Sequence, residues 1–212
     1  DPPQFTTGPD QSVLEDAVPL VVSPWATQIN PGPFEDSQSV TFEIVVVTNP
    51  SLFRTQPSVS VLGSLQFAVN LNAFGIAQVS IRARDSGGTS NGGADVSTTR
   101  TFQITVDPVN DAPRLELTDG FSVLEDSDGH SYAADLWVAS FSPGPANEQS
   151  QSAAEYLLVQ YSNPALFSSA PTLTSAGLLR FSLAENASGE AQLSIKVRDD
   201  GGTANGGVDL SQ

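Results

Sequence analysis

The 212-residue sequence has no cysteine, no methionine and a single histidine. The absence of cysteine excludes disulfide bonds, thiolate catalysis and cysteine-based zinc sites. Basic residues are also scarce, because 8 lysines and arginines stand against 24 aspartates and glutamates and give a formal net charge of -16. A chain of this charge is repelled by phosphate backbones and anionic lipids, so we expect no nucleic-acid partner. No apolar run approaches the ~20 residues of a membrane-spanning helix, and we expect no membrane insertion of this segment.

The sequence contains two copies of one repeat. Residues 12–16 (SVLED) return as 122–126, residues 49–53 (NPSLF) match 163–167 (NPALF), and residues 84–89 (RDSGGT) match 198–203 (RDDGGT). Self-similarity of this kind predicts tandem domains, which we place at residues 1–110 and 111–212. Copy one closes with an alternating segment at residues 101–106, whereas copy two reaches only Gln212, the counterpart of Thr98. We therefore expect the second domain to lack its last strand, which further chain or a neighbour would supply.

Apolar and polar residues alternate through most of each copy, which indicates β-strands rather than helices. In residues 76–84 the inward set is Ala77, Val79, Ile81 and Ala83. Other strands of copy one are expected near residues 12–15, 20–22, 40–47, 58–62, 65–69 and 100–106. Seven strands in a repeat of this length predict an all-β fold of two tandem seven-strand Greek-key sandwiches with immunoglobulin-like architecture.

This topology predicts at which end of each domain the acidic residues lie. Strands that run up and down would bring the first corner of copy one to the linker, and would bring the loops of copy two to its entry. The candidate metal ligands are therefore Glu15, Asp16, Asp107, Asn110, Asp111, Glu148, Asp199, Asp200 and Asp209, with Asn147 beside Glu148. Clustered carboxylates repel one another, and the usual solutions are protonation, separation of the side chains or a bound hard cation. If a cation binds, an oxygen-only set favours Ca²⁺. The alternative for any single residue is an ordinary solvated turn.

Two motifs carry a family resemblance. Residues 107–113 (DPVNDAP) resemble the Asp-x-Asn-Asp-x-Pro linker of cadherin-like repeats, and residues 81–87 (IRARDSG) resemble the cadherin strand that ends in Ala-x-Asp-x-Gly. The whole chain is similar to tandem cadherin-like repeats of very large bacterial and algal surface proteins. The resemblance implies that Glu15, Asp107, Asn110, Asp111 and Asp199 bind Ca²⁺ between domains. The Leu-Asp-Arg-Glu motif of animal cadherins has no match in residues 65–75.

The expected function is that of a structural spacer or adhesion segment in an extracellular or cell-surface fibrous protein. Its partners would be neighbouring repeats of the same polypeptide, with lateral or filament assembly left open. We expect no enzymatic activity and no catalytic residue, because the only histidine, His130, has no counterpart in copy one. A carbohydrate-binding module with a glycan partner is the alternative, since Trp25 and Trp137 could stack on sugars. Their recurrence in both copies favours a core role instead.

Overall fold

The computed structural model describes residues 1–118, 120, 122–125, 131–135 and 138–212. It divides the chain into two compact units, unit 1 (Asp1–Pro108) and unit 2 (Val109–Gln212), two residues before the boundary expected from the repeats. The regular elements are strands, joined in places by short 3-10 turns. Within the described residues, no helix has the length and apolar character that crossing a membrane requires.

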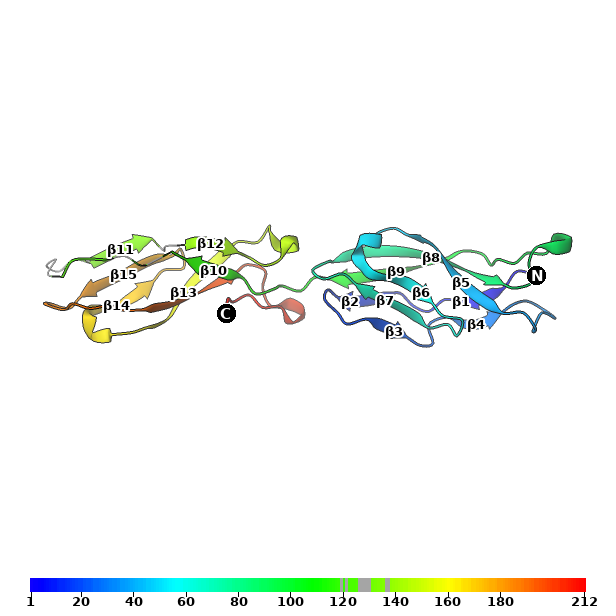
Figure 1. Cartoon of the computed structure of the whole chain (residues 1–212), viewed down its shortest axis with the longest axis horizontal. Coiled ribbons are helices and arrows are strands. Elements are labelled where there is room, and N and C mark those ends of the chain that lie inside the picture. The colour runs from blue at the N-terminus through cyan, green and yellow to red at the C-terminus, as the bar shows by residue number, and fades with distance from the viewer. Residues whose placement is uncertain (119, 121, 126–130, 136–137) are drawn as a thin grey trace. The chain divides into compact units, whose positions relative to one another are not determined.

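Unit 1 is a two-layer β-sandwich (Figure 1). The first sheet has the order β2–β9–β8–β5, formed by Gln11–Leu14, Arg100–Asp107, Gly75–Asp85 and Val40–Val47. The second has the order β3–β7–β6, formed by Leu20–Val22, Leu65–Val69 and Phe53–Val59, and a separate pair joins β1 (Gln4–Thr6) to β4 (Thr27–Asn30). Strand β2 runs parallel to β9, and the remaining pairs are antiparallel. The expected all-β sandwich is confirmed.

The core of unit 1 lies between these sheets. Val79 and Ile81 of β8 are 0% exposed and belong to the same cluster as Leu65 of β7. Trp25 is 2% exposed, and its ring centroid lies 4.4 Å from that of Phe102. The indole N–H of Trp25 donates to the carbonyl of Pro9 at 3.0 Å, which satisfies its polar atom inside the core. Trp25 thus has the expected core role, while Trp137 and His130 lie outside the described residues.

One expected strand of unit 1 was wrong. The strand placed at residues 58–62 is instead β6, Phe53–Val59, and a tight turn follows it. In this turn the N–H of Gly63 donates to Ser60 at 2.8 Å, and Gly63 has a φ of +79°, which glycine adopts without a steric penalty. Strands β1 and β4, of three and four residues, were not expected from the sequence.

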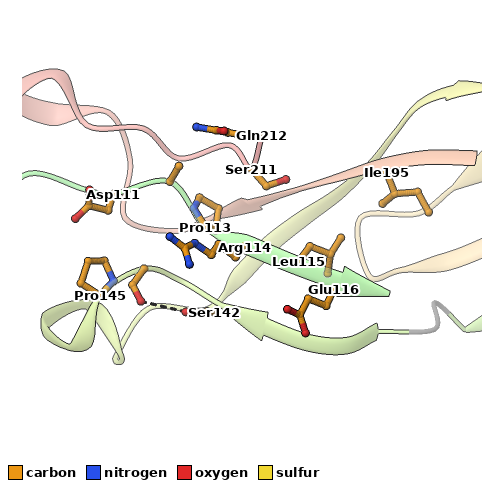
Figure 2. Close-up of a pocket in the computed structure, with 12 residues that line it drawn as sticks. Asp111, Pro113, Arg114, Leu115, Glu116, Ser142, Pro145, Ile195, Ser211 and Gln212 are labelled. Carbon is orange, nitrogen blue, oxygen red and sulfur yellow. Dashed lines mark hydrogen bonds between the residues drawn. The ribbon is translucent and has the colours of Figure 1, made fainter. Parts of the chain in front are cut away.

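Unit 2 follows the same plan, except that its described residues form no strand equivalent to β2 or to β9. Its pairs are β10 (Arg114–Leu117) with β12 (Val138–Ser142), and β13 (Ala153–Tyr161) with β16 (Leu193–Asp199). A three-stranded sheet contains β11 (Ser131–Asp135), β15 (Leu178–Leu183) and β14 (Phe167–Leu173). Among the described residues of unit 2, no strand takes the place that β9 has in unit 1. A groove of about 640 Å³ is lined by Leu115 and Glu116 of β10 and Ile195 of β16 (Figure 2).

Candidate metal centre

Two of the expected ligands meet at the end of β9 in unit 1. The N–H of Glu15 donates to the carbonyl of Asp107 at 2.9 Å, and the hydroxyl of Ser12 donates to the Asp107 carboxylate at 2.8 Å. Glu15 is only 3% exposed. The carboxylate of Asp16 accepts a hydrogen bond from the N–H of Asn72 at 2.7 Å. The first corner and the start of the linker are therefore adjacent, as the topology argument required.

At the start of unit 2, the linker is bonded to the loop that follows β16. The side-chain amide of Asn110 donates to the Asp199 carboxylate at 3.0 Å and to the Val208 carbonyl at 2.9 Å. The same Asp199 oxygen accepts from the N–H of Gly201 at 2.9 Å. Asp199 is 2% exposed and Asn110 is 9% exposed. A carboxylate and an amide that lie 89 residues apart in the sequence are thus held together in a buried position.

A second carboxylate is positioned by the turn Ala146–Glu148. The N–H of Asp111 donates to Oε1 of Glu148 at 2.9 Å, and Glu148 is 5% exposed. A Cβ atom at Gly144 would lie 1.7 Å from Oε2 of Glu148. Only glycine fits at this position without moving the carboxylate, so the turn holds Glu148 against the linker. Asn147 belongs to the same turn.

Buried oxygen atoms that accept no hydrogen bond gather at this end of unit 2. They are Oδ1 of Asn110, Oε1 of Gln151 and Oδ2 of Asp199. A Cβ atom at Gly201 would lie 1.9 Å from Oδ1 of Asn110 and 2.6 Å from Nε2 of Gln151, so both amides crowd the same point. A buried acceptor that lacks a donor costs about 1–3 kcal/mol, and such atoms in native proteins call for a water or an ion. We name Asn110, Asp111, Glu148, Gln151 and Asp199 the unit 2 pole.

Unit 1 repeats this arrangement with residues that the sequence analysis did not select. The terminal nitrogen of Asp1 donates to Oε1 of Glu35 at 3.0 Å, as Asp111 does to Glu148. Oε2 of Glu35, Oε1 of Gln38 and Oδ2 of Asp85 are buried and accept no hydrogen bond. We name Asp1, Glu35, Gln38 and Asp85 the unit 1 pole. Alignment of the two copies pairs Glu35 with Glu148, Gln38 with Gln151 and Asp85 with Asp199. Comparison of the two repeats could therefore have identified the unit 1 residues from the sequence.

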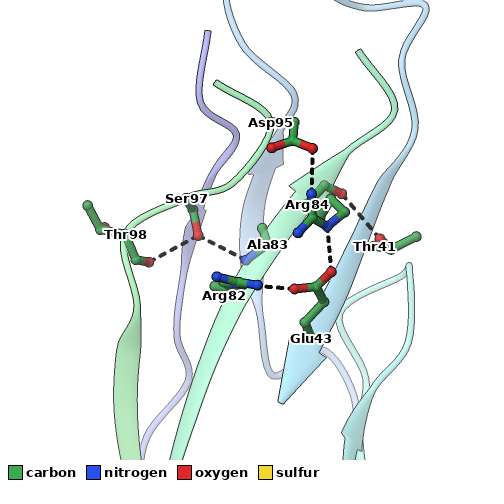
Figure 3. Close-up of polar contacts among 8 residues, drawn as sticks. All are labelled: Thr41, Glu43, Arg82, Ala83, Arg84, Asp95, Ser97 and Thr98. Atoms are coloured by element: carbon green, nitrogen blue, oxygen red, sulfur yellow. Dashed lines mark hydrogen bonds and ion pairs between the residues drawn. The ribbon is translucent and has the colours of Figure 1, made fainter. Parts of the chain in front are cut away.

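The remaining candidates, Asp200 and Asp209, have other partners. The Asp200 carboxylate accepts from the N–H of Ser152 at 2.8 Å and from its hydroxyl at 2.7 Å, and these bonds lower the pKa of Asp200. Asp209 forms an ion pair with Arg198 at 2.7 Å. Unit 1 has the equivalent pair between Arg84 and Asp95 (Figure 3). Both carboxylates therefore stabilise the loop itself.

Each pole is a mixed set of carboxylate and amide oxygens. Within the part of the chain that the structure describes, no group of three or more aspartate, glutamate or histidine side chains is placed to hold a metal ion by itself. The unit 2 pole adds the amides of Asn110 and Gln151 to the carboxylates of Glu148 and Asp199. Hard cations such as Ca²⁺ accept amide as well as carboxylate oxygens, which makes this set chemically suitable for one.

Comparison with known proteins gives a result for structure but none for sequence. No protein-family model and no curated protein matches the chain. Mouse cadherin-23 EC22-24 matches 99% of the chain, with a TM-score of 0.55 and 15% identity. Human protocadherin-24 EC1-2 matches 99% of the chain and 91% of its own length, with a TM-score of 0.53 and 15% identity. The fold is that of tandem cadherin repeats.

This likeness agrees with the linker and strand motifs, which pointed to cadherin-like repeats. The chain spans 63% of the length of the mouse cadherin-23 structure, and the match to human protocadherin-24 extends over both of its units. In the cadherin-like repeats of this chain, each pole combines the last residue of a strand, Asp85 of β8 or Asp199 of β16, with residues outside that strand. The sandwich supplies the framework, and the loops supply the candidate ligands.

Proposed function

We propose that this chain is a structural spacer or adhesion segment of an extracellular or cell-surface protein, and that Ca²⁺ bound at the poles of its cadherin-like repeats stiffens it. One observation carries the proposal. Each pole contains buried carboxylate and amide oxygens that accept no hydrogen bond, and two of them, on Gln38 and Asp85 in unit 1, have equivalents on Gln151 and Asp199 in unit 2. A chance turn has no reason to bury the same two acceptors, a glutamine amide oxygen and an aspartate oxygen, in both repeats, whereas a cation would satisfy them.

The donor set fits Ca²⁺ better than other common metals. Ca²⁺ takes 6–8 oxygen ligands in flexible geometry, and it accepts carboxylates, amide carbonyls and backbone carbonyls together. Zinc and copper prefer nitrogen or sulfur, and the chain has no cysteine and one histidine. In unit 2 the ion would be held by Asn110, Asp111, Glu148 and Asp199, with Gln151 beside them. The ion would neutralise carboxylates that burial otherwise makes unfavourable.

The connection between the repeats is short, which is why we propose that the ion stiffens it. Asp107 and Asn110 are three residues apart, so the chain between them spans at most about 11 Å. Glu15 and Asp107 supply carboxylates at the end of unit 1. We propose that these two join the ligands of unit 2, and that the linker Pro108–Val109 acts as a hinge when no cation is bound.

Calorimetric titration of the full chain with Ca²⁺ tests the binding. The variant Asp199→Asn keeps the size of the side chain and its ability to accept from Asn110 and Gly201, but it removes the charge. We expect about tenfold or weaker Ca²⁺ affinity, which corresponds to the loss of about 1.4 kcal/mol. The matched control is Asp200→Asn, one residue along the same loop, where the carboxylate is engaged by Ser152. Equal losses in both variants would show that general charge, not the proposed ligand set, governs binding.

Small-angle X-ray scattering tests the stiffening separately. The full chain is measured with saturating Ca²⁺ and again with EDTA. We expect a narrower distribution of interatomic distances with Ca²⁺, because the hinge at the linker is then fixed. Identical profiles at confirmed saturation would refute the stiffening and leave only a bound ion.

The alternative of a sugar-binding module receives no support from Trp25, because its ring is 2% exposed and packs in the core. A buried indole has no face on which a sugar ring can stack. Saturable binding on a glycan array that persists in EDTA would nevertheless favour that alternative over the proposed role.

A further inference from the structure

Both repeats carry an asparagine followed by a glycine in the long loop after the strand that ends at the pole. Asn91 with Gly92 follows β8, and Asn205 with Gly206 follows β16. All four residues are exposed, and a Cβ atom built on either glycine would have open space around it. An asparagine in this position is chemically labile in water, because a glycine nitrogen has no side chain beside it to hinder its attack on the amide.

The reaction available to such a pair is deamidation through a five-membered ring. The backbone nitrogen of the glycine loses its proton and attacks Cγ of the asparagine, and a C–N bond forms. The side-chain nitrogen takes up the proton and leaves as ammonia. Water then opens the succinimide at either carbonyl carbon, which gives aspartate or isoaspartate. Water is the only co-reactant, and the loop gains one negative charge.

The closed loops hold the two reacting atoms apart. Ring closure requires the glycine nitrogen to eclipse Cβ of the asparagine about the Cα–C bond, which in an L-residue means a strongly negative ψ. Asn91 has a φ of 55° and a ψ of 28°, and Asn205 has a φ of 58° and a ψ of 17°. These angles turn the nitrogen to the side opposite Cβ. Each loop must therefore open before it reacts, and the rate measures how often it opens.

The loop of unit 2 is tied to the linker residue Asn110. The N–H of Val208 donates to the carbonyl of Asn110 at 2.8 Å, and the side-chain amide of Asn110 donates to the carbonyl of Val208 at 2.9 Å. Gly207 is buried, and a Cβ atom there would lie 2.9 Å from the backbone nitrogen of Asn110. At the equivalent Gly93 of unit 1, the nearest atoms belong to residues 88–90 of the same loop. The two loops thus share their local conformation but differ in what they pack against.

We propose that Asn91 and Asn205 are sites of spontaneous deamidation, and that the contact with Asn110 makes Asn205 the slower of the two. The chemistry is the same at both sites, because each asparagine precedes a glycine and has the same left-handed conformation. Opening the loop of unit 2 also breaks the two hydrogen bonds between Val208 and Asn110, so we expect Asn205 to react about tenfold more slowly. The proposal does not depend on a bound metal ion, since it uses only the loops and the linker.

The test incubates the full chain in EDTA at mildly alkaline pH and follows each asparagine by peptide mapping with mass spectrometry. We expect aspartate and isoaspartate at Asn91 first and at Asn205 later. Asn186 is the internal control, because it is exposed and has a φ of +54° but precedes an alanine. It should stay unmodified. The same chain in urea is the reference, in which Asn91 and Asn205 should react at equal rates.

The two parts of the proposal fail separately. If neither Asn91 nor Asn205 reacts in the folded chain while both react to completion in urea, or if Asn186 reacts as fast as they do, the assignment of the sites is overturned. If Asn205 reacts in the folded chain as fast as Asn91, the role of Asn110 is overturned.

The variant Asn110→Ala tests the contact directly. It removes the hydrogen bond from the side-chain amide to Val208 and keeps the backbone one. We expect Asn205 to react several-fold faster and Asn91 to keep its rate. An unchanged rate at Asn205 would refute the role of Asn110. Amide hydrogen exchange of the unsubstituted chain gives a second measure that does not depend on the folding of the variant: Val208 should exchange more slowly than its unit 1 counterpart Ala94, and equal exchange would also refute that role.

Discussion

The substitution Gly201→Ala tests how tightly the unit 2 pole is assembled. A Cβ atom at this position would lie 1.9 Å from Oδ1 of Asn110 and 2.4 Å from its Cγ atom. Asn110 must therefore move, but its amide is fixed by hydrogen bonds to Asp199 at 3.0 Å and to Val208 at 2.9 Å. Overpacking costs about 1–3 kcal/mol, and each hydrogen bond that is lost adds about 1 kcal/mol. We expect unit 2 to lose roughly 2–4 kcal/mol of stability.

The matched control is Gly87→Ala in unit 1, which changes the equivalent glycine. There a Cβ atom would meet only the end of the Gln38 side chain, at 2.5 Å from Oε1. A flexible amide end can rotate away, so we expect a loss of less than about 1 kcal/mol. Neither glycine has a positive φ, and the comparison is therefore free of backbone strain at the substituted residue.

Differential scanning calorimetry in EDTA provides the measurement. For a unit of about 100 residues, each kcal/mol shifts the melting temperature by about 4–8 °C. Gly201→Ala should lower one transition by roughly 10–25 °C, and Gly87→Ala should shift the other by only a few degrees. Equal and small shifts for both variants would show that Asn110 is not held as described. Gly201→Ala should also bind Ca²⁺ more weakly, because the added Cβ atom displaces Oδ1 of Asn110.

Two further predictions concern unit 1. Hydrogen bonds from Arg84 and then Arg82 lower the pKa of Glu43 below its ordinary value of 4.5 (Figure 3). These hydrogen bonds therefore stabilise unit 1 above pH 4.5, and the stabilisation is lost as the pH falls through the lowered pKa. Glu43→Gln should lower the melting temperature at pH 7, and in acid its melting temperature should approach that of the unsubstituted chain. A constant difference across that range would contradict this. Trp25→Phe removes the bond to Pro9 and part of the packing on Phe102. We expect unit 1 to lose about 1–3 kcal/mol in urea titration, and no loss would mean that the indole is not a core anchor.

The fold could be predicted from the sequence because the repeat and the alternation of apolar and polar residues both indicate tandem β-sandwiches. Residues 77–84 alternate strictly between apolar and polar, and β8 buries the inward set that the pattern indicated. The pattern failed where local turn geometry decides the structure. At residues 60–63, an apolar pair continues the strand pattern, but Gly63 permits a turn that ends β6 early. Exposed Val61 and Leu62 thus belong to a turn, where alternation carries no information.

The candidate site could be predicted from the sequence only in part, for a different physical reason. Glu148 and Asp199 were predicted as ligands because they carry carboxylates, and the structure buries both beside the linker. Gln38 and Gln151 carry no charge, so nothing in the composition marks them, and their place at the poles depends on how the loops fold onto Gly87 and Gly201. Asp209 shows the converse. Its charge suggested a ligand, but the basic residue that pairs with it, Arg198, lies 11 residues away on β16.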